Sequence, residues 1–257
     1  MSPELEAAMA AARTAADIMR RWFDGGFEVR TKEDRTPVTQ ADVECEQAIR
    51  EIIMMRFPDH GFYGEETGLA TRESPNLWLV DPIDGTKSFV RGQPFFSTQI
   101  ALLREGVPVL GVSSAPLFDE IAWAEAGAGA FLNGERLRVS GIAEISDAVL
   151  STGNLKSLAA SGGWQRLGEI VTSVNRIRGY GDFYHYHLLA AGKIDAVVES
   201  DVGILDVAAL SLIVQEAGGV FTDLNGRPPR LEMRSVLAAA NPTLHAHLLE
   251  RLSGYVP

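Results

Sequence analysis

The chain has 257 residues, of which 46% are hydrophobic and 22% charged, a composition that suits a globular protein with a sizeable core. Its formal net charge of -11 argues against the basic surface that nucleic-acid and anionic-membrane partners require, and we expect neither partner. The single cysteine, Cys45, excludes an internal disulfide framework, and with no signal peptide or bilayer-spanning run visible we expect a cytoplasmic protein.

The first part of the chain predicts two helices followed by a mainly antiparallel sheet. Apolar residues recur at helical spacing over residues 3–22 and again over 41–57. A short strand over 27–30 and a polar loop over 31–37 separate these helices. Short strand-like runs follow at residues 62–64 and 77–80. Apolar runs punctuated by Gly and Pro then predict an antiparallel sheet with hairpins, with strands at residues 96–103, 107–113, 121–125 and 130–132.

The pattern changes near Ser140. Short strands then alternate with helices, in segments at residues 149–152, 164–171, 176–178, 182–191 and 194–199. The remaining segments predict a helix at 206–216, a strand at 219–222 and a helix at 242–252. We therefore expect a layered α/β (α+β) protein with two halves, residues 1–140 and 141–257.

The most informative segment reads Asp81-Pro-Ile-Asp-Gly-Thr86 and follows an apolar strand. A strand end with a tight turn can point Asp81, Asp84 and the Ile83 carbonyl at one place, and hard divalent cations prefer such oxygen ligands. Gly85 and Thr86 can donate backbone N–H groups to a phosphate. Alone, the segment fits a solvated turn equally well, because Asp, Pro and Gly are common turn formers.

Three other segments carry acidic residues, each of which has an ordinary explanation by itself. Glu65 and Glu66 end a strand-like run, where adjacent acids repel each other unless they are solvated or bind a cation. Thr39 and Asp42 begin one predicted helix and Asp206 begins another, and such residues are common helix caps. The presence of all these acids in one chain favours a metal site over separate explanations.

In their order along the chain, these segments resemble the inositol monophosphatase family. The matching runs are Val38-Thr-Gln-Ala-Asp42, Gly64-Glu-Glu66, Asp81-Pro-Ile-Asp-Gly-Thr86, Asp206-Val-Ala-Ala209 and Glu216-Ala-Gly-Gly219. The resemblance covers nearly the whole chain. It implies a layered αβαβα sandwich of the inositol monophosphatase/fructose-bisphosphatase type and a Mg²⁺-dependent, lithium-sensitive phosphatase. It also implies a homodimer that acts on a small phosphorylated metabolite.

The resemblance further implies a role for each matching residue. The magnesium ligands, for two or three ions per site, would be Glu65, Asp81, the Ile83 carbonyl, Asp84 and Asp206. All but Asp206 lie in the first half, and Asp81 would bridge two ions. The catalytic group would comprise Asp42, Thr86 and Glu65, with Asp42 paired to the Thr86 hydroxyl. Backbone N–H groups of Gly85 and Thr86 would bind the phosphate. We expect direct attack by a metal-activated water, without a phosphoenzyme.

The substrate prediction depends on the segment Arg176-Ile-Arg-Gly-Tyr-Gly-Asp-Phe183 and on Glu199. This segment is similar to that of the histidinol-phosphate phosphatases within the family. Asp182 and Glu199 would add negative charge that favours a cationic amino alcohol over a neutral polyol. We therefore predict hydrolysis of L-histidinol phosphate to L-histidinol and phosphate, a step of histidine biosynthesis. The predicted substrate contacts are Asp84, Arg178, Asp182 and Glu199.

Several alternatives remain at this stage. An inositol-1-monophosphatase-type enzyme of broad specificity is the alternative within the same class. A non-catalytic regulatory or binding homologue is the alternative from another class, although it has no need for so many acids. Asp182 has a second explanation as a helix cap, and Tyr180, Phe183 and Tyr184 have one as core packing.

Overall fold

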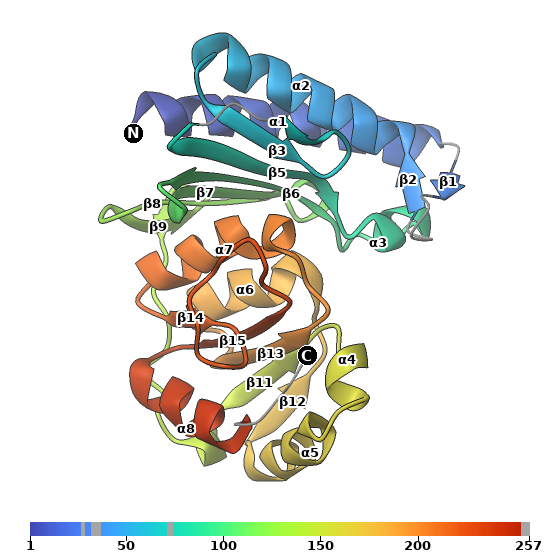
Figure 1. Cartoon of the computed structure of the whole chain (residues 1–257). Coiled ribbons are helices and arrows are strands. Elements are labelled where there is room, and N and C mark those ends of the chain that lie inside the picture. The colour runs from blue at the N-terminus through green and yellow to red at the C-terminus, as the bar shows by residue number, and fades with distance from the viewer. Residues whose placement is uncertain (27–28, 32–36, 71–73, 253–257) are drawn as a thin grey trace.

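The computed structural model describes residues 1–26, 29–31, 37–70 and 74–252. Figure 1 shows helices α1 and α2 above an eight-stranded sheet, then α6 and α7, then a five-stranded sheet, and finally α4, α5 and α8. This order confirms the αβαβα sandwich expected from the sequence. None of the helices in the described ranges is both long enough and apolar enough to cross a membrane.

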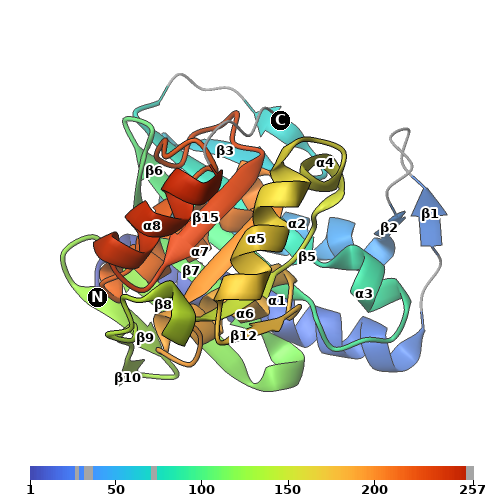
Figure 2. The same cartoon turned by 90° about the horizontal axis from the view of Figure 1, so that it is seen from below.

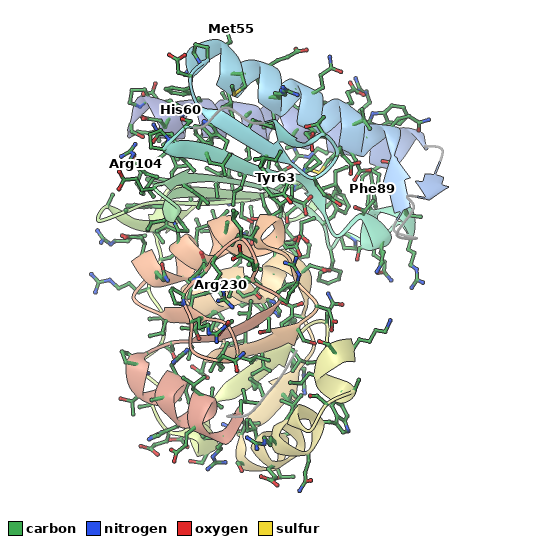
Figure 3. All side chains as sticks on the ribbon, viewed as in Figure 1. Met55, His60, Tyr63, Phe89, Arg104 and Arg230 are labelled. Atoms are coloured by element: carbon green, nitrogen blue, oxygen red, sulfur yellow. The ribbon has the colours of Figure 1, made fainter. Side chains whose placement is uncertain are left out.

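The two N-terminal helices begin at side-chain caps. Helix α1 (Pro3–Gly25) starts after Ser2, whose side chain accepts a hydrogen bond from the Leu5 N–H at 3.1 Å. Helix α2 (Gln40–Arg56) starts after Thr39, which forms a capping box with Asp42. Both helices lie where helical spacing predicted them. Figure 3 labels Met55 on the outer end of α2, where its side chain is 83% exposed.

The eight-stranded sheet has the strand order β10-β9-β8-β7-β6-β5-β3-β4. Its strands are β3 (Gly61–Gly64), β4 (Gly68–Ala70), β5 (Asn76–Asp84), β6 (Ser97–Arg104), β7 (Val107–Ala115), β8 (Glu120–Glu125), β9 (Gly129–Leu132) and β10 (Glu135–Arg136). All neighbouring strands are antiparallel except β3 and β5, which are parallel. The 3₁₀ turn η1 (Pro116–Phe118) joins β7 to β8. The antiparallel sheet predicted for residues 96–132 is confirmed by β6, β7, β8 and β9.

The prediction of a turn between Asp81 and Asp84 is wrong. Strand β5 continues through Asp84, and its pairing with β6 shifts register between these two residues. The intervening Pro82 has no N–H to donate to a strand ladder, which accounts for an irregularity here. The chain turns one residue later, at Gly85, and then forms α3 (Thr86–Val90).

A small antiparallel pair is formed by β1 (Val29–Thr31) and β2 (Pro37–Thr39), and β2 contacts α3 although the two are far apart in the sequence. Its strands overlap the ends of the predicted strand at 27–30 and the predicted loop at 31–37. Residues 27–28 and 32–36 of those two predictions lie outside the described residues.

The five-stranded sheet has the order β12-β11-β13-β15-β14. Its strands are β11 (Val149–Thr152), β12 (Arg176–Arg178), β13 (Ala196–Ser200), β14 (Val220–Thr222) and β15 (Ser235–Ala239). The sequence analysis missed β15, whose five residues show no alternation of polar and apolar side chains and include Ala238 and Ala239, a residue type depleted in strands. On the outer face lie α4 (Lys156–Ala159), α5 (Gly163–Ser173), α8 (Pro242–Leu252) and the turn η2 (Ile145–Asp147), and Figure 2 shows α5 and α8 in front of this sheet.

Helices α6 (Asp182–Ala190) and α7 (Ile204–Glu216) fill the space between the two sheets. Helix α7 is apolar around most of its circumference, as expected for a helix covered on both sides. It approaches β7 so closely that a Cβ at Gly111 would lie 2.6 Å from the Ala209 carbonyl oxygen. Glycine at this position therefore allows the helix to pack directly on the sheet.

Candidate metal and phosphate site

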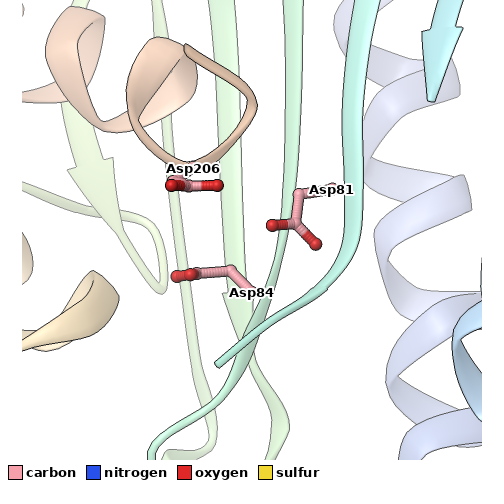
Figure 4. Close-up of side chains that lie close together, drawn as sticks. All are labelled: Asp81, Asp84 and Asp206. Atoms are coloured by element: carbon pink, nitrogen blue, oxygen red, sulfur yellow. The ribbon is translucent and has the colours of Figure 1, made fainter. Parts of the chain in front are cut away.

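Three aspartates from two distant segments meet between the eight-stranded sheet and α7 (Figure 4). Asp81 and Asp84 come from the end of β5, and Asp206 comes from the first turn of α7. One oxygen of each carboxylate lies within 4.8 Å of the other two. The fold thus brings together three of the predicted metal-ligating residues.

Each of these carboxylates is held by a donor of the protein. The Ile83 N–H donates to Asp81 Oδ1 at 3.0 Å, and the Gly203 N–H donates to Asp206 Oδ2 at 2.7 Å. The Ser97 hydroxyl donates to Asp84 Oδ2 at 3.4 Å. Asp206 therefore closes the start of its helix and faces the cluster at the same time, so the capping explanation and the metal explanation coexist.

Burial and mutual repulsion make this cluster hard to ionise. Burial is the largest cause of the raised pKa of Asp81, followed by the charges of Glu65 and Asp84. Burial also raises the pKa of Asp84 well above its usual value, and it raises that of Asp206 to about 6. A cation among these groups would offset both effects. Because every metal-ligating atom of the three carboxylates is an oxygen, the cluster fits a hard divalent ion such as Mg²⁺.

Glu65 reaches the cluster from the loop after β3. Its side chain is exposed, yet it forms a hydrogen bond with Asp81 and its charge acts on Asp42, Asp81 and Asp206. The predicted ligand Glu65 therefore lies beside the three aspartates, on their solvent side.

Asp42 and Thr86 also lie together, as predicted. Asp42 is fully buried, and its Oδ2 accepts hydrogen bonds from the Thr39 N–H at 2.7 Å and the Thr39 hydroxyl at 2.6 Å. Its Oδ1 lies 3.3 Å from the Thr86 hydroxyl, which is also 3.0 Å from the Ile83 carbonyl oxygen. Burial raises the pKa of Asp42, against the opposing effect of the bonds from Thr39. This carboxylate is therefore prepared to accept a proton.

Gly85 makes the turn between the aspartates and α3 possible. Its φ of +86° lies in the left-handed region, and a Cβ at this position would be 2.6 Å from the Phe95 carbonyl oxygen. The N–H groups of Ser88 and Phe89 donate to the Gly85 carbonyl oxygen at 2.8 and 3.0 Å. Phe89, labelled in Figure 3, is fully buried and anchors the short helix.

Asp84 and Asp206 share a small cavity with two of the predicted substrate contacts, Asp182 and Glu199. The cavity has a volume of about 20 Å³, which is room for one water-sized group. Burial, followed by the charge of Glu199, raises the pKa of Asp182 to about 6. Gly181 occupies the capping position of α6, so Asp182 is not the helix cap. Its own φ of +44° is unusual for a residue other than glycine.

Glu199 is 3% exposed and is bound by groups of the chain itself. Its Oε1 accepts a hydrogen bond from the Asn154 N–H at 3.0 Å, and its Oε2 accepts one from the Tyr186 hydroxyl at 2.9 Å. His185 Nε2 lies 3.2 Å from the same Oε2, but its direction does not suit a hydrogen bond. Glu199 thus contributes charge to the cavity wall while most of its acceptor capacity is used.

The structure does not bring Arg178 into this cavity. Its side chain is exposed on β12 and donates from Nη1 to the Ile177 carbonyl oxygen at 2.7 Å. Phe183 is fully buried in the core, which confirms core packing as its explanation. Tyr180 and Tyr184 are half-buried and form an aromatic group with Phe118, at ring distances of 5.8 Å for the tyrosine pair and 4.8 Å for Tyr184 and Phe118.

The sequence model of the inositol monophosphatase family matches residues 1–256. The chain belongs to the inositol monophosphatase family. Its relatives include a histidinol-phosphatase of Mycobacterium tuberculosis, 41% identical over 97% of this chain and 98% of that protein. An inositol-1-monophosphatase of Caulobacter vibrioides is 35% identical over 94% of this chain and 98% of that protein. The crystal structure of suhB from Bartonella henselae has a TM-score of 0.90 at 32% identity and covers 99% of this chain and 100% of that chain.

These matches confirm the family expected from the sequence motifs, and they make the chain a phosphatase, a phosphoric monoester hydrolase. The acids at its centre are the oxygen-rich cluster that a metal-dependent phosphatase needs.

The sequence analysis missed one residue that shapes the site of this phosphatase, Glu46 on α2. This side chain is 1% exposed, and its two oxygens accept the N–H groups of Glu66 and Thr67 at 2.7 and 2.9 Å. A Cβ at Gly64 would lie 2.4 Å from its carboxyl carbon, so a side chain there would displace the Glu46 carboxylate. Glu46 therefore positions the turn that carries Glu65. The available signal was a charged residue next to Cys45 and three before Ile49, on the apolar face of the predicted helix.

Proposed function

We propose that this phosphatase is a Mg²⁺-dependent histidinol-phosphate phosphatase of histidine biosynthesis. The observation that carries the substrate proposal is the position of Asp182 and Glu199 beside the aspartate cluster. The 41% identity to a protein named histidinol-phosphatase, over nearly the full length of both chains, supports the same substrate.

The proposed metal ligands are the oxygens of Glu65, Asp81, Asp84 and Asp206 and the Ile83 carbonyl, for two or three ions. When bound, divalent ions would neutralise charge on the phosphate and make water a better nucleophile at neutral pH. The raised pKa values of the aspartates support this assignment, because the cluster gains most from a cation.

The remaining groups of the chain would position the reactants. Asp42, through the Thr86 hydroxyl, would orient the attacking water and take up its proton. The N–H groups of Gly85 and Thr86 would hold the phosphoryl oxygens. Water would form a bond to phosphorus while the ester P–O bond breaks in line with it, the leaving alkoxide would take a proton from solvent to give the alcohol, and no phosphoenzyme is made.

The acidic cavity would distinguish the alcohol part of the substrate. Its acidic walls suit a cation, and its volume of about 20 Å³ has room for one group the size of an ammonium. We therefore place the amine of histidinol phosphate next to Asp182, with Glu199 behind it, and the ring outside the cavity. Arg178 would have to leave the Ile177 carbonyl to contact the substrate.

The alternative is an inositol-1-monophosphatase-type enzyme of broad specificity, which the 35% identity to a protein of that name favours. The test is phosphate release by the full chain in Mg²⁺, comparing kcat/KM for histidinol phosphate, inositol 1-phosphate and a sugar bisphosphate. A clear preference for inositol 1-phosphate would overturn the substrate proposal. Full activity after exhaustive chelation would overturn the metal proposal, and no release from any ester would favour a non-catalytic homologue.

Four further properties complete the proposal. They are a homodimer, a cytoplasmic location, inhibition by lithium, and two folding halves at residues 1–140 and 141–257. Light scattering during size-exclusion chromatography tests the dimer, and a lithium titration of phosphate release tests the inhibition.

A further inference from the structure

A row of buried polar side chains crosses the eight-stranded sheet beside the aspartate cluster. Asp81 of β5 is the direct cross-strand partner of Gln99 on β6, and Gln99 is the partner of Ser113 on β7. Direct partners point to the same face of a sheet, so this row faces α6 and α7. Gln99 is 1% exposed and Ser113 is fully buried. Polar groups in such a position are costly unless their hydrogen bonds are made.

The hydrogen bonds of Gln99 determine which group donates and which accepts along the whole row. Its Nε2 lies 2.8 Å from Ser97 Oγ and 3.0 Å from Ser113 Oγ, so both amide protons are donated. Each serine hydroxyl therefore accepts from Gln99 and keeps its own proton for another acceptor. For Ser97 that acceptor is Asp84 Oδ2, at 3.4 Å.

The other end of the row is compatible with the same direction. The Ser113 hydroxyl, which accepts from Gln99, lies 2.9 Å from His187 Nε2 and can donate its proton to this ring nitrogen. His187 then carries its own proton on Nδ1, which lies 2.8 Å from Glu120 Oε2. Every donor between Glu120 and Gln99 thus has an acceptor.

Gln99 Oε1 is buried and has no hydrogen-bond partner among the described residues. The reversed amide would place this oxygen next to the two serine hydroxyls. In that orientation the proton of Ser97 would turn to Gln99 and away from Asp84. The observed orientation leaves one acceptor unpaired and keeps a donor directed at Asp84.

We propose that Gln99 is a positioning residue that holds Asp84 in place for metal binding through the Ser97 hydroxyl. The inference rests on the proposed function, because it assumes that Asp84 is a metal ligand. Groups that bind metal ligands without touching the metal contribute tenfold to a hundredfold to metal affinity in other proteins. Ser97 has such a place here because it donates to Asp84, and Gln99 holds Ser97 by donating to its hydroxyl.

The test is Mn²⁺ binding by the purified full chain, followed by the electron paramagnetic resonance signal of the free ion. Gln99→Leu and Ser97→Ala should each weaken Mn²⁺ binding about tenfold. If Gln99 acts through Ser97, the double variant should be no weaker than Ser97→Ala alone. The Mg²⁺ concentration for half-maximal phosphate release should rise by the same factor in each variant. Ser114→Ala, a buried serine on the opposite face of β7, is the control and should bind Mn²⁺ like the wild type.

The outcomes separate this inference from the proposed function. Wild-type affinity in Ser97→Ala would overturn the inference even if Gln99→Leu failed to fold, and the proposed function would stand. If the two substitutions each weaken Mn²⁺ binding and their effects multiply in the double variant, Gln99 does not act through Ser97. A wild-type protein that binds no Mn²⁺ would overturn the proposed function together with the inference.

Discussion

Replacing Asp206 by Asn should stabilise the metal-free protein at alkaline pH while removing its activity. The pKa of Asp206 is about 6 in the folded protein against an ordinary value of 3.8, mainly because of burial. A raised carboxyl pKa contributes stability to the folded state that is fully present at pH values below 3.8. This stability is lost as the pH rises through 6. The difference of about two units corresponds to about 3 kcal/mol. Asn keeps an acceptor for the Gly203 N–H but carries no charge.

The assay is urea unfolding of wild type and Asp206→Asn in EDTA at pH 4 and pH 8. The free energy of unfolding of the variant minus that of the wild type should be larger at pH 8 than at pH 4, by up to about 3 kcal/mol. In thermal unfolding this is about 6 to 12 °C for a chain of this size. Asp81 and Asp84 remain in both proteins, and their raised pKa values act in the same direction in each.

Saturating Mg²⁺ should reverse the order at pH 8, because the ion stabilises only the protein that binds it. A variant that is no more stable than the wild type in EDTA at pH 8 would refute the reasoning. So would a stability difference that does not change between pH 4 and pH 8.

The remaining predictions concern three other residues. Asp84→Asn should lower kcat/KM about 100-fold or more, because a metal ligand loses its charge; phosphate release at the wild-type rate by a folded variant would contradict this. Gly85→Ala should cost about 2 kcal/mol of unfolding free energy, because φ is +86° and a Cβ would meet the Phe95 carbonyl at 2.6 Å; unchanged urea unfolding would count against it. Asp182→Asn should raise KM for histidinol phosphate about tenfold at pH 8 and leave inositol 1-phosphate unaffected. Since the pKa of Asp182 is about 6, the effect should shrink at pH 5, where the wild-type carboxyl is protonated; an equal effect at both pH values would argue against an ionic contact.

Local signals explain why the helices were predictable. Ser2 and Thr39 cap α1 and α2 through bonds within the next few residues, and the apolar spacing that follows is visible in the sequence itself. The strands from β6 to β9 are likewise bounded by turn residues. By contrast, β15 is buried along its whole length, and only its pairing with β13 and β14 reveals it as a strand.

The sequence alone determined which residue types were available for the chemistry. Asp81, Asp84, Glu65 and Asp206 stand in segments whose order matches the family, so the phosphatase class followed before any coordinates. Those matches depend on residue identity, which a chain carries whether or not it is folded.

Tertiary structure alone decided which other side chains support these acids. Glu46 holds the turn of Glu65 from a neighbouring helix, and Gln99 reaches Ser113, as Ser97 reaches Asp84, only because β5, β6 and β7 pair in one register. The physical reason is that a buried hydrogen bond between distant segments depends on how whole elements pack. No local periodicity records that packing, so contacts of this kind become visible only in the folded chain.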